Sequence, residues 1–294
     1  MEVIYEVAFM SSSFRITHRL VTLQIMLEEV DKLHIHEETI PDVLSRLTEK
    51  IKADGYFIHP IIVDEKSLVV LDGMHRVAAV QNLGYRFIPV CLVDYDNPNV
   101  VVGSWYRLIY NLSDIKKVSN ILKELNLTME DCPFETAREL VERREAVTAI
   151  FSRLKCFAVY GPQKSIKEIY DAIKQIESKL QSKGYSMGYD TEKGAKEIVY
   201  SGKASAALMT PTVSKEEIVK TALAGGVFPQ KTTRHVIPAR PMFINVPLEW
   251  LYGKLSLPEA NKQLVELLSS KKLKCLPPGQ VLDRRYEEEL YVFM

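Results

Sequence analysis

Five consecutive residues, Asp72 to Arg76, have the types and order needed to bind phosphate. The apolar run 68–71 precedes them, which predicts a strand that enters a glycine turn and then a helix. Such a junction directs the unpaired backbone N–H groups of the first helical turn, and the positive end of the helix dipole, at one point. An arginine can also hold two phosphate oxygens at once. We therefore predict that Gly73, Met74, His75 and Arg76 bind phosphate.

Asp72 stands at the end of the predicted strand, where its carboxylate could take part in chemistry. It could orient a donor, or face a Mg²⁺ ion that is itself held mainly by nucleotide phosphates. The segment also fits a plain turn, in which Asp72 caps the helix and Arg76 makes a surface ion pair. The local pattern leaves both interpretations open.

An acidic pair, Glu37 and Glu38, lies in a turn before a predicted helix. Phosphoryl transfer to an alcohol needs a carboxylate near the attacking hydroxyl, to orient it and to accept its proton. Acidic residues are also favoured in the first turn of a helix for electrostatic reasons. The residue types alone therefore allow a catalytic base or a helix-terminal charge.

Four consecutive polar residues follow a glycine-containing loop later in the chain: Thr232, Thr233, Arg234 and His235. Their hydroxyls, guanidinium and imidazole suit a small zwitterion that carries a carboxylate and, after reaction, a phosphate. A polar surface loop is the alternative. Trp105 lies in a predicted strand, where an aromatic side chain is most often part of the core.

Two sets of elements must position these residues. In the first part of the chain we predict a strand at 23–30, a helix at 40–53, a hairpin at 60–63 and 68–71, a helix at 75–83, and strands at 86–94 and 100–106. In the remainder we predict helices at 114–127, 135–154 and 165–183, and strands at 156–160, 204–209, 242–246 and 289–293. The roles of residues 1–22 and of the tail after Lys271 stay open.

The composition excludes several classes of protein. The chain has 294 residues with 38 basic and 38 acidic side chains, so it lacks the basic excess of a sequence-independent DNA-binding protein. Its four cysteines form no C-x-x-C pair, which argues against a zinc site. It has no G-x-x-x-x-G-K-[ST] pattern and no apolar stretch long enough to cross a membrane. We expect a cytoplasmic protein with no membrane or nucleic-acid partner.

The strand, the D-G-x-H-R turn and the helix together resemble the signature of the ParB/sulfiredoxin superfamily. Sulfiredoxins carry a catalytic cysteine where this chain has Met74, and a thioether cannot form the thiolate that their chemistry needs. ParB proteins follow the turn with a DNA-binding helix-turn-helix region, against which the balanced charge argues.

The free L-serine kinases of this superfamily resemble the chain from about Leu23 to Val246. The similarity rests on His36-Glu37-Glu38, on Asp72 to Arg76, and on Lys231 to His235 with Val236-Ile237-Pro238 behind them. The family often has a second histidine at the position of Met74, which puts a side-chain role there in doubt but not the backbone cradle.

The resemblance implies an α/β (α+β) fold, with a ParB/sulfiredoxin-like nucleotide-binding domain at 1–114, a second mixed α/β domain at 115–294, and a cleft between them. It implies a kinase that transfers a phosphoryl group from an adenine nucleotide, ATP rather than ADP by default, to free L-serine. Cysteine biosynthesis is one pathway that the product could serve. The alternative is a ParB-like, nucleotide-dependent DNA-binding regulator.

The resemblance also assigns roles to the candidate residues. Glu37, with Glu38 as the near alternative, is the expected catalytic base, and Asp72 the second catalytic carboxylate. Trp105, Thr232, Thr233, Arg234 and His235 are expected to bind the amino acid. Mg²⁺ is the expected cofactor, held mainly through nucleotide phosphates, with no residue assigned as a metal ligand. The choice of donor, the pathway and the oligomeric state cannot be read from the sequence.

Overall fold

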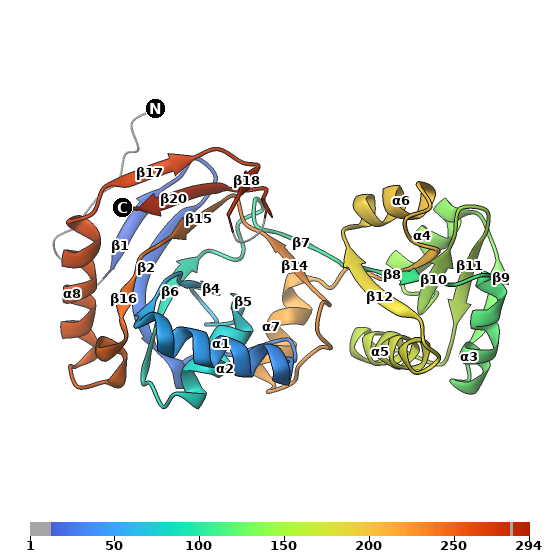
Figure 1. Ribbon diagram of the computed structural model, residues 1–294, viewed down its shortest axis with the longest axis horizontal. Coiled ribbons are helices and arrows are strands. Elements are labelled where there is room, and N and C mark those ends of the chain that lie inside the picture. The colour runs from blue at the N-terminus through green and yellow to red at the C-terminus, as the bar shows by residue number, and fades with distance from the viewer. Residues whose placement is uncertain (1–12, 283–284) are drawn as a thin grey trace. The chain divides into compact units, whose positions relative to one another are not determined.

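The computed structural model describes residues 13–282 and 285–294 (Figure 1). Two compact units divide the chain: the first takes residues up to 101, 215–227 and 235–294, and the second takes 102–214 and 228–234. These units interleave along the chain, whereas the sequence suggested one boundary at residue 114. The division into folding domains at 1–114 and 115–294 stays a prediction.

The first unit is built on a five-stranded sheet in the order β1-β2-β6-β4-β5. Its strands are β1 (Phe14–Thr17), β2 (Thr22–Glu29), β4 (Ile61–Asp64), β5 (Val70–Asp72) and β6 (Phe87–Val93). β4 is parallel to β6, and the other neighbours are antiparallel. Every residue of β4 and β6 is buried, as expected for inner strands covered on both faces. The predicted strands at 23–30, 60–63, 68–71 and 86–94 are confirmed.

Two helices of the first unit pack against each other, as Figure 1 shows in blue and cyan. α1 (Pro41–Asp54) begins with proline, whose missing N–H is not needed there, and ends at Gly55 with a φ of 71°. α2 (Met74–Asn82) begins after Gly73, whose φ is 109°. A β-carbon at Gly73 would lie 2.5 Å from Cγ2 of Ile61, so the turn requires glycine for both reasons.

The C-terminal part of the chain adds a second sheet to this unit, in the order β15-β20-β17. β15 (Ala239–Met242) runs parallel to β20 (Glu289–Phe293), and β17 (Leu273–Leu276) runs antiparallel to it. The predicted last strand at 289–293 is confirmed. The strand predicted at 242–246 is displaced toward the N-terminus, because Phe243 and Asn245 have positive φ values of 58° and 51°, which end the extended conformation.

The remaining elements of the first unit are short or lie outside the two sheets. They are η1 (Val30–Lys32), β3 (Tyr56–Phe57), α7 (Lys215–Leu223), β16 (Val246–Pro247), η3 (Leu248–Tyr252), α8 (Leu257–Ser269), β18 (Gln280–Val281) and β19 (Arg285–Tyr286). Strands β7 (Val101–Gly103) and β14 (Arg234–Val236) contain two of the four positions where the chain passes from one unit to the other.

The second unit is an antiparallel sheet of six strands with helices packed on it (Figure 1). The strand order is β12-β8-β13-β10-β11-β9. The strands are β8 (Tyr106–Tyr110), β9 (Thr128–Asp131), β10 (Thr148–Phe151), β11 (Cys156–Tyr160), β12 (Ser186–Asp190) and β13 (Ala206–Met209). The helices are η2 (Ile115–Lys117), α3 (Val118–Glu124), α4 (Phe134–Glu142), α5 (Ile166–Ser182) and α6 (Glu192–Tyr200).

The predicted helix at 135–154 is wrong in its second half. α4 ends at Glu142, Arg144 has a φ of 62°, and β10 follows at Thr148–Phe151. All four residues of β10 are buried between β11 and β13, and a short run of buried apolar residues has the same hydrophobicity in a strand as in a helix. Within the described residues, no helix is long and apolar enough to span a bilayer.

Candidate active site

The turn after β5 has the geometry expected for a phosphate cradle. Met74 and His75 are the first two residues of α2, and the first N–H groups of a helix have no acceptor within the helix. The N–H groups of Arg76 and Val77 are already bonded to the carbonyl of Gly73, at 2.8 and 3.0 Å. The backbone donors offered to a ligand are therefore those that precede Arg76.

The side chain of Arg76 is oriented by the protein rather than extended into solvent. Its Nη1 donates to the carbonyls of His59 and Pro60, at 3.0 and 2.8 Å, and its Nη2 lies 3.4 Å from Oδ2 of Asp72. The side chain is 22% exposed. Arg76 therefore connects the turn to the segment before β4 by hydrogen bonds. These bonds also keep the positive charge of the guanidinium next to the turn.

His75 connects the turn to the start of α1. Its Nε2 accepts the backbone N–H of Ile40 at 2.9 Å, so in the neutral ring the proton is on Nδ1. Ile40 is the residue that precedes α1. The bond therefore holds the residue after the acidic segment next to the turn from Asp72 to Arg76, which is called the phosphate turn below.

The acidic segment lies along β5, the strand that ends at Asp72. The backbones of His34 and Val69 form a bridge, and Nδ1 of the fully buried His36 donates to the carbonyl of Val70 at 2.8 Å. Burial lowers the pKa of His36 to about 4, so this imidazole is neutral near pH 7. Glu37 follows directly and is only 9% exposed, whereas Glu38 is half-buried. The structure thus brings Glu37 and the predicted cradle into the same unit.

Asp72 is held by two arginines, one of which the sequence did not reveal. Its Oδ2 accepts from Arg76 and from Arg240 of β15, and Arg240 also contacts Glu288. Arg240 was missed because its partners are 168 and 48 residues away in the chain. A double arginine contact holds the carboxylate in one orientation and neutralises part of its charge.

His235 belongs to the first unit, although it follows Thr232 to Arg234 directly in sequence. Its Nε2 lies 2.8 Å from the hydroxyl of Tyr95, and its ring packs edge-on against His36 with centroids 5.3 Å apart. Burial, and secondarily His36, lower the pKa of His235, and its imidazole also hydrogen-bonds the carbonyl of Leu71. Tyr95 is a second residue that sequence reasoning missed. These contacts place His235 beside β5 and the acidic segment.

Trp105, Thr233 and two neighbours come together in the second unit. The indole Nε1 of Trp105 donates to the carbonyl of Thr233 at 3.0 Å, and the ammonium of Lys231 lies 5.0 Å from the centre of the indole ring. The guanidinium of Arg234 lies against Gly103, where a β-carbon would be 3.0 Å from Nη2. Four of the five predicted amino-acid-binding residues are thus neighbours in space or in the chain.

The hydroxyl of Thr232 is committed to the protein. Thr232 is fully buried, and its Oγ1 donates to the carbonyl of Pro229 at 2.7 Å, while Tyr170 donates to the carbonyl of Thr232 at 3.2 Å. Arg107, which the sequence did not single out, donates to the carbonyl of Trp105 at 2.5 Å. These bonds fix the backbone on which Trp105, Thr233 and Arg234 stand.

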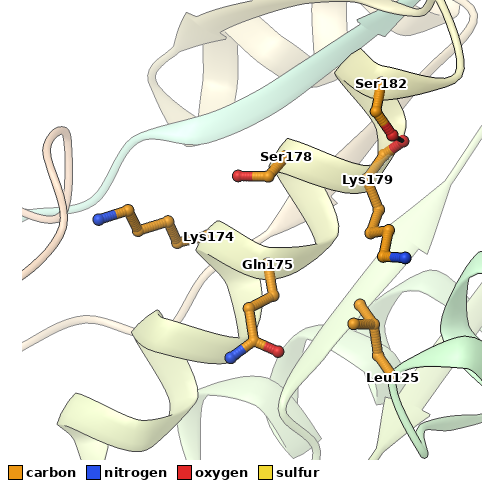
Figure 2. Close-up of a pocket in the computed structure, with 6 residues that line it drawn as sticks. All are labelled: Leu125, Lys174, Gln175, Ser178, Lys179 and Ser182. Carbon is orange, nitrogen blue, oxygen red and sulfur yellow. Dashed lines mark hydrogen bonds between the residues drawn. The ribbon is translucent and has the colours of Figure 1, made fainter.

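A surface hollow on the second unit is lined by none of the predicted residues. Its volume is about 490 Å³, and Figure 2 shows its lining along α5 with one residue beyond that helix: Leu125, Lys174, Gln175, Ser178, Lys179 and Ser182. It contains no residue with a role in the predicted chemistry. The candidate residues are therefore separate from the lining of this hollow.

The described residues offer few ligands for a metal ion. In the described part of the chain no group of three or more His, Cys, Asp or Glu side chains could hold one. Asp72 is engaged by two arginines, which leaves its carboxylate a poor single ligand. This donor set fits Mg²⁺, which is usually bound by few protein carboxylates together with substrate phosphates.

The fold and the turn define a mixed α/β protein of the ParB/sulfiredoxin type, with a glycine turn between a strand and a helix. No protein-family model matches the chain. The chain is 34% identical over 235 residues to an ATP-dependent L-serine kinase of Staphylothermus marinus, covering 77% of this chain and 90% of the relative. It is 30% identical to an ADP-dependent L-serine kinase of Thermococcus kodakarensis, covering 76% and 91%.

A solved structure leads to the same family. A glutamate-to-alanine mutant of a free serine kinase in complex with AMP superposes with a TM-score of 0.68 and 28% identity, covering 78% of this chain and 94% of that chain. The chain belongs to the free L-serine kinase family.

Proposed function

We propose that the protein transfers a phosphoryl group from an adenine nucleotide to the hydroxyl of free L-serine, giving O-phospho-L-serine. The position of Glu37 carries the proposal, because this buried carboxylate lies beside the strand that ends in the phosphate turn. ATP is the proposed donor, since the relative with 34% identity is named ATP-dependent. The named relatives support this activity over a nucleotide-dependent DNA-binding role.

Glu37 would orient the serine hydroxyl and accept its proton as the oxygen attacks the γ-phosphorus. The bond from the γ-phosphorus to the bridging oxygen breaks, and ADP leaves. Backbone N–H groups of the turn and the charge of Arg76 would bind the nucleotide phosphates and stabilise the charge that develops on them. A related free serine kinase has been solved with one glutamate replaced by alanine or by glutamine, which supports the choice of a glutamate as the base.

For the amino acid, Arg234 would bind the carboxylate and Trp105 would form a wall of the pocket. Thr233 is the threonine best placed to contact the ligand, because the hydroxyl of Thr232 already donates to Pro229. His235 would act through its position next to His36, with Nε2 accepting from Tyr95. The hydrogen bond from Trp105 to the carbonyl of Thr233, and the position of Arg234 directly after Thr233, support these roles.

Mg²⁺ would be held by the nucleotide phosphates and would supply charge neutralisation between them. A cytoplasmic location stays a prediction from the composition of the sequence, and use of the product in cysteine biosynthesis stays a prediction from the family resemblance.

The deciding experiment is a phosphoserine assay on the purified protein. It should be incubated with Mg²⁺, L-serine and either ATP or ADP, and the products separated and identified. We expect O-phospho-L-serine with ATP and less or none with ADP. L-threonine and L-homoserine serve as controls for the acceptor. Absence of phosphoserine with both nucleotides would reject the proposed activity.

A further inference from the structure

Arg240 joins two carboxylates in the interior of the first unit. Its Nη1 bonds to Oδ2 of Asp72, and its Nε donates to Oε1 of Glu288 at 2.9 Å. The side chains of Arg240 and Glu288 are 8% and 12% exposed. Burial alone lowers the pKa of Arg240, but Asp72 and Glu288 outweigh burial and raise it, so the guanidinium keeps its charge.

The register of the C-terminal sheet creates this contact. β15 and β20 are parallel, with Ala239 opposite Glu289, and the N–H of Glu289 donates to the carbonyl of Pro238 at 3.2 Å. Glu288 is therefore held at the start of β20, next to Arg240 on the neighbouring strand. The sequence left the role of the tail open. In the structure, Glu288 of the tail is linked to Asp72 of the phosphate turn through Arg240.

The four charged side chains around the turn balance. Arg76 and Arg240 are cations, Asp72 and Glu288 are anions, and they form one connected set. The side chain of Asp72 is 40% exposed, so a phosphate group bound at the turn is subject to its negative charge. A carboxylate at such a position opposes phosphate binding unless cations neutralise it.

We propose that Arg240 and Glu288 set the charge of the phosphate turn and thereby its affinity for the phosphate groups of a nucleotide. The proposal makes the C-terminal sheet an electrostatic part of the nucleotide site. It rests on the proposed function only in that the turn from Asp72 to Arg76 binds nucleotide, and it does not depend on serine as the acceptor.

Two substitutions change this charge in opposite directions. Glu288→Gln keeps an oxygen acceptor for Nε of Arg240 and leaves the set with one excess positive charge, so ADP should bind about threefold more tightly at low salt. Arg240→Gln leaves one excess negative charge, so ADP should bind at least about tenfold more weakly. Because added salt screens charges, both differences should become smaller at roughly 0.5 M salt.

The measurement is titration calorimetry with ADP, without serine, at low and high salt. Glu287→Gln is the matched control: it removes the same charge one residue earlier, from a side chain that is 68% exposed and pairs with Arg285 at 2.7 Å. It should leave the affinity unchanged. Thermal unfolding confirms that each variant is folded.

A scaffolding role for the tail would weaken ADP binding in both variants or in neither. ADP affinity in Glu288→Gln that equals or falls below the wild-type value, or a change that high salt does not reduce, overturns the proposal. If Arg240→Gln does not fold, Glu288→Gln and its salt dependence decide alone. Phosphoserine formation is measured separately on the wild-type protein, so its absence, with ADP affinities ordered as expected, rejects only the serine kinase activity.

Discussion

Glu37 and Glu38 are adjacent carboxylates with different surroundings. Glu37 is 9% exposed next to the anchored His36, whereas Glu38 is half-buried. A base removed from water and held by its neighbours is better oriented toward one acceptor. If Glu37 is the base, Glu37→Gln should lower kcat by at least about a hundredfold and change ADP affinity by less than about threefold.

Steady-state kinetics and ADP titration of Glu37→Gln and Glu38→Gln test this assignment. Glu38→Gln is the matched control and should keep kcat within about threefold of the wild-type value. Full turnover in Glu37→Gln together with loss of turnover in Glu38→Gln would assign the base to Glu38.

His36 predicts a dependence of stability on pH. In the folded protein its pKa is lowered to about 4 by burial, from an ordinary value of 6.5. Between these values the unfolded chain binds more protons than the folded one, so the free energy of unfolding decreases as the pH falls from about 7 to 4. His36→Asn keeps an N–H donor for the Val70 carbonyl and removes this titration.

Urea denaturation at a series of pH values measures the effect. Relative to its own value at pH 7, His36→Asn should lose less stability by pH 4, by on the order of 2–3 kcal/mol, than the wild-type protein. Parallel pH profiles for the two proteins would show that His36 does not titrate in this window.

The candidate residues that the sequence revealed are those whose chemistry is local. Asp72 to Arg76 can be recognised because strand, glycine turn and donors are consecutive. Arg240 and Tyr95 could not be predicted, because each acts on a group that only tertiary structure brings near. Arg240 reaches Asp72 across 168 positions, and Tyr95 reaches His235 across 140.

At the scale of elements, the start of α2 is tightly constrained at Gly73. Gly73→Ala would combine a φ of 109° with a β-carbon 2.5 Å from Ile61. We expect a loss of about 2–4 kcal/mol of stability, and at least about tenfold weaker ADP binding because the cradle must shift. Gly84 follows α2 with a φ of 70°, and a β-carbon there would meet nothing within 4 Å.

Gly84→Ala is therefore the control for Gly73→Ala, since it carries backbone strain without a clash or a role in the cradle. It should cost about 1 kcal/mol and leave ADP affinity unchanged. Urea denaturation and ADP titration of both variants are the measurements. Equal ADP affinity in Gly73→Ala and the wild-type protein would show that the turn does not bind the phosphates.

Helices with clear signals at their ends could be predicted, whereas the buried strand β10 could not be separated from the helix before it. α5 has a capping box at Ser165 and Glu168 and matches the predicted helix at 165–183. β10 is apolar on both faces and reads equally well as the continuation of α4. Both faces of β10 are buried, so its sequence lacks the alternation of apolar and polar residues by which a strand is recognised.

At the scale of the whole molecule, the first unit is completed by residues from both ends of the described chain. β15, β17 and β20 belong to the same unit as β1 to β6, although residues 102–214 of the second unit lie between them in the chain. The sequence does not show that the C-terminal strands pack in the first unit. A hydrophobic pattern indicates that one face of an element is buried, but it does not identify the element that covers that face. We therefore expect the stability of the turn from Asp72 to Arg76 to depend on the C-terminal elements.

Asn261 of α8 tests that dependence directly. It is 1% exposed, its Oδ1 accepts the N–H of Leu27 at 2.7 Å, and its Nδ2 donates to the carbonyl of Leu27 at 3.1 Å. Asn261→Ala leaves both backbone groups of β2 without these partners in a buried place, and should cost about 2–4 kcal/mol. Because β2 lies next to β6 in the sheet that carries β5, this loss should lower the thermal midpoint of the ADP-bound protein as well as that of the free protein.

Lys262→Ala changes the neighbouring, exposed residue of α8 and should alter stability by less than about 0.5 kcal/mol. Thermal unfolding of both variants, with and without ADP, provides the measurement. A single transition that shifts in Asn261→Ala and is restored in part by ADP indicates that α8 and the phosphate turn unfold together. If Asn261→Ala instead unfolds in an early transition that ADP does not move, the C-terminal elements form a separate cooperative unit, and the electrostatic link through Arg240 operates without sharing their stability.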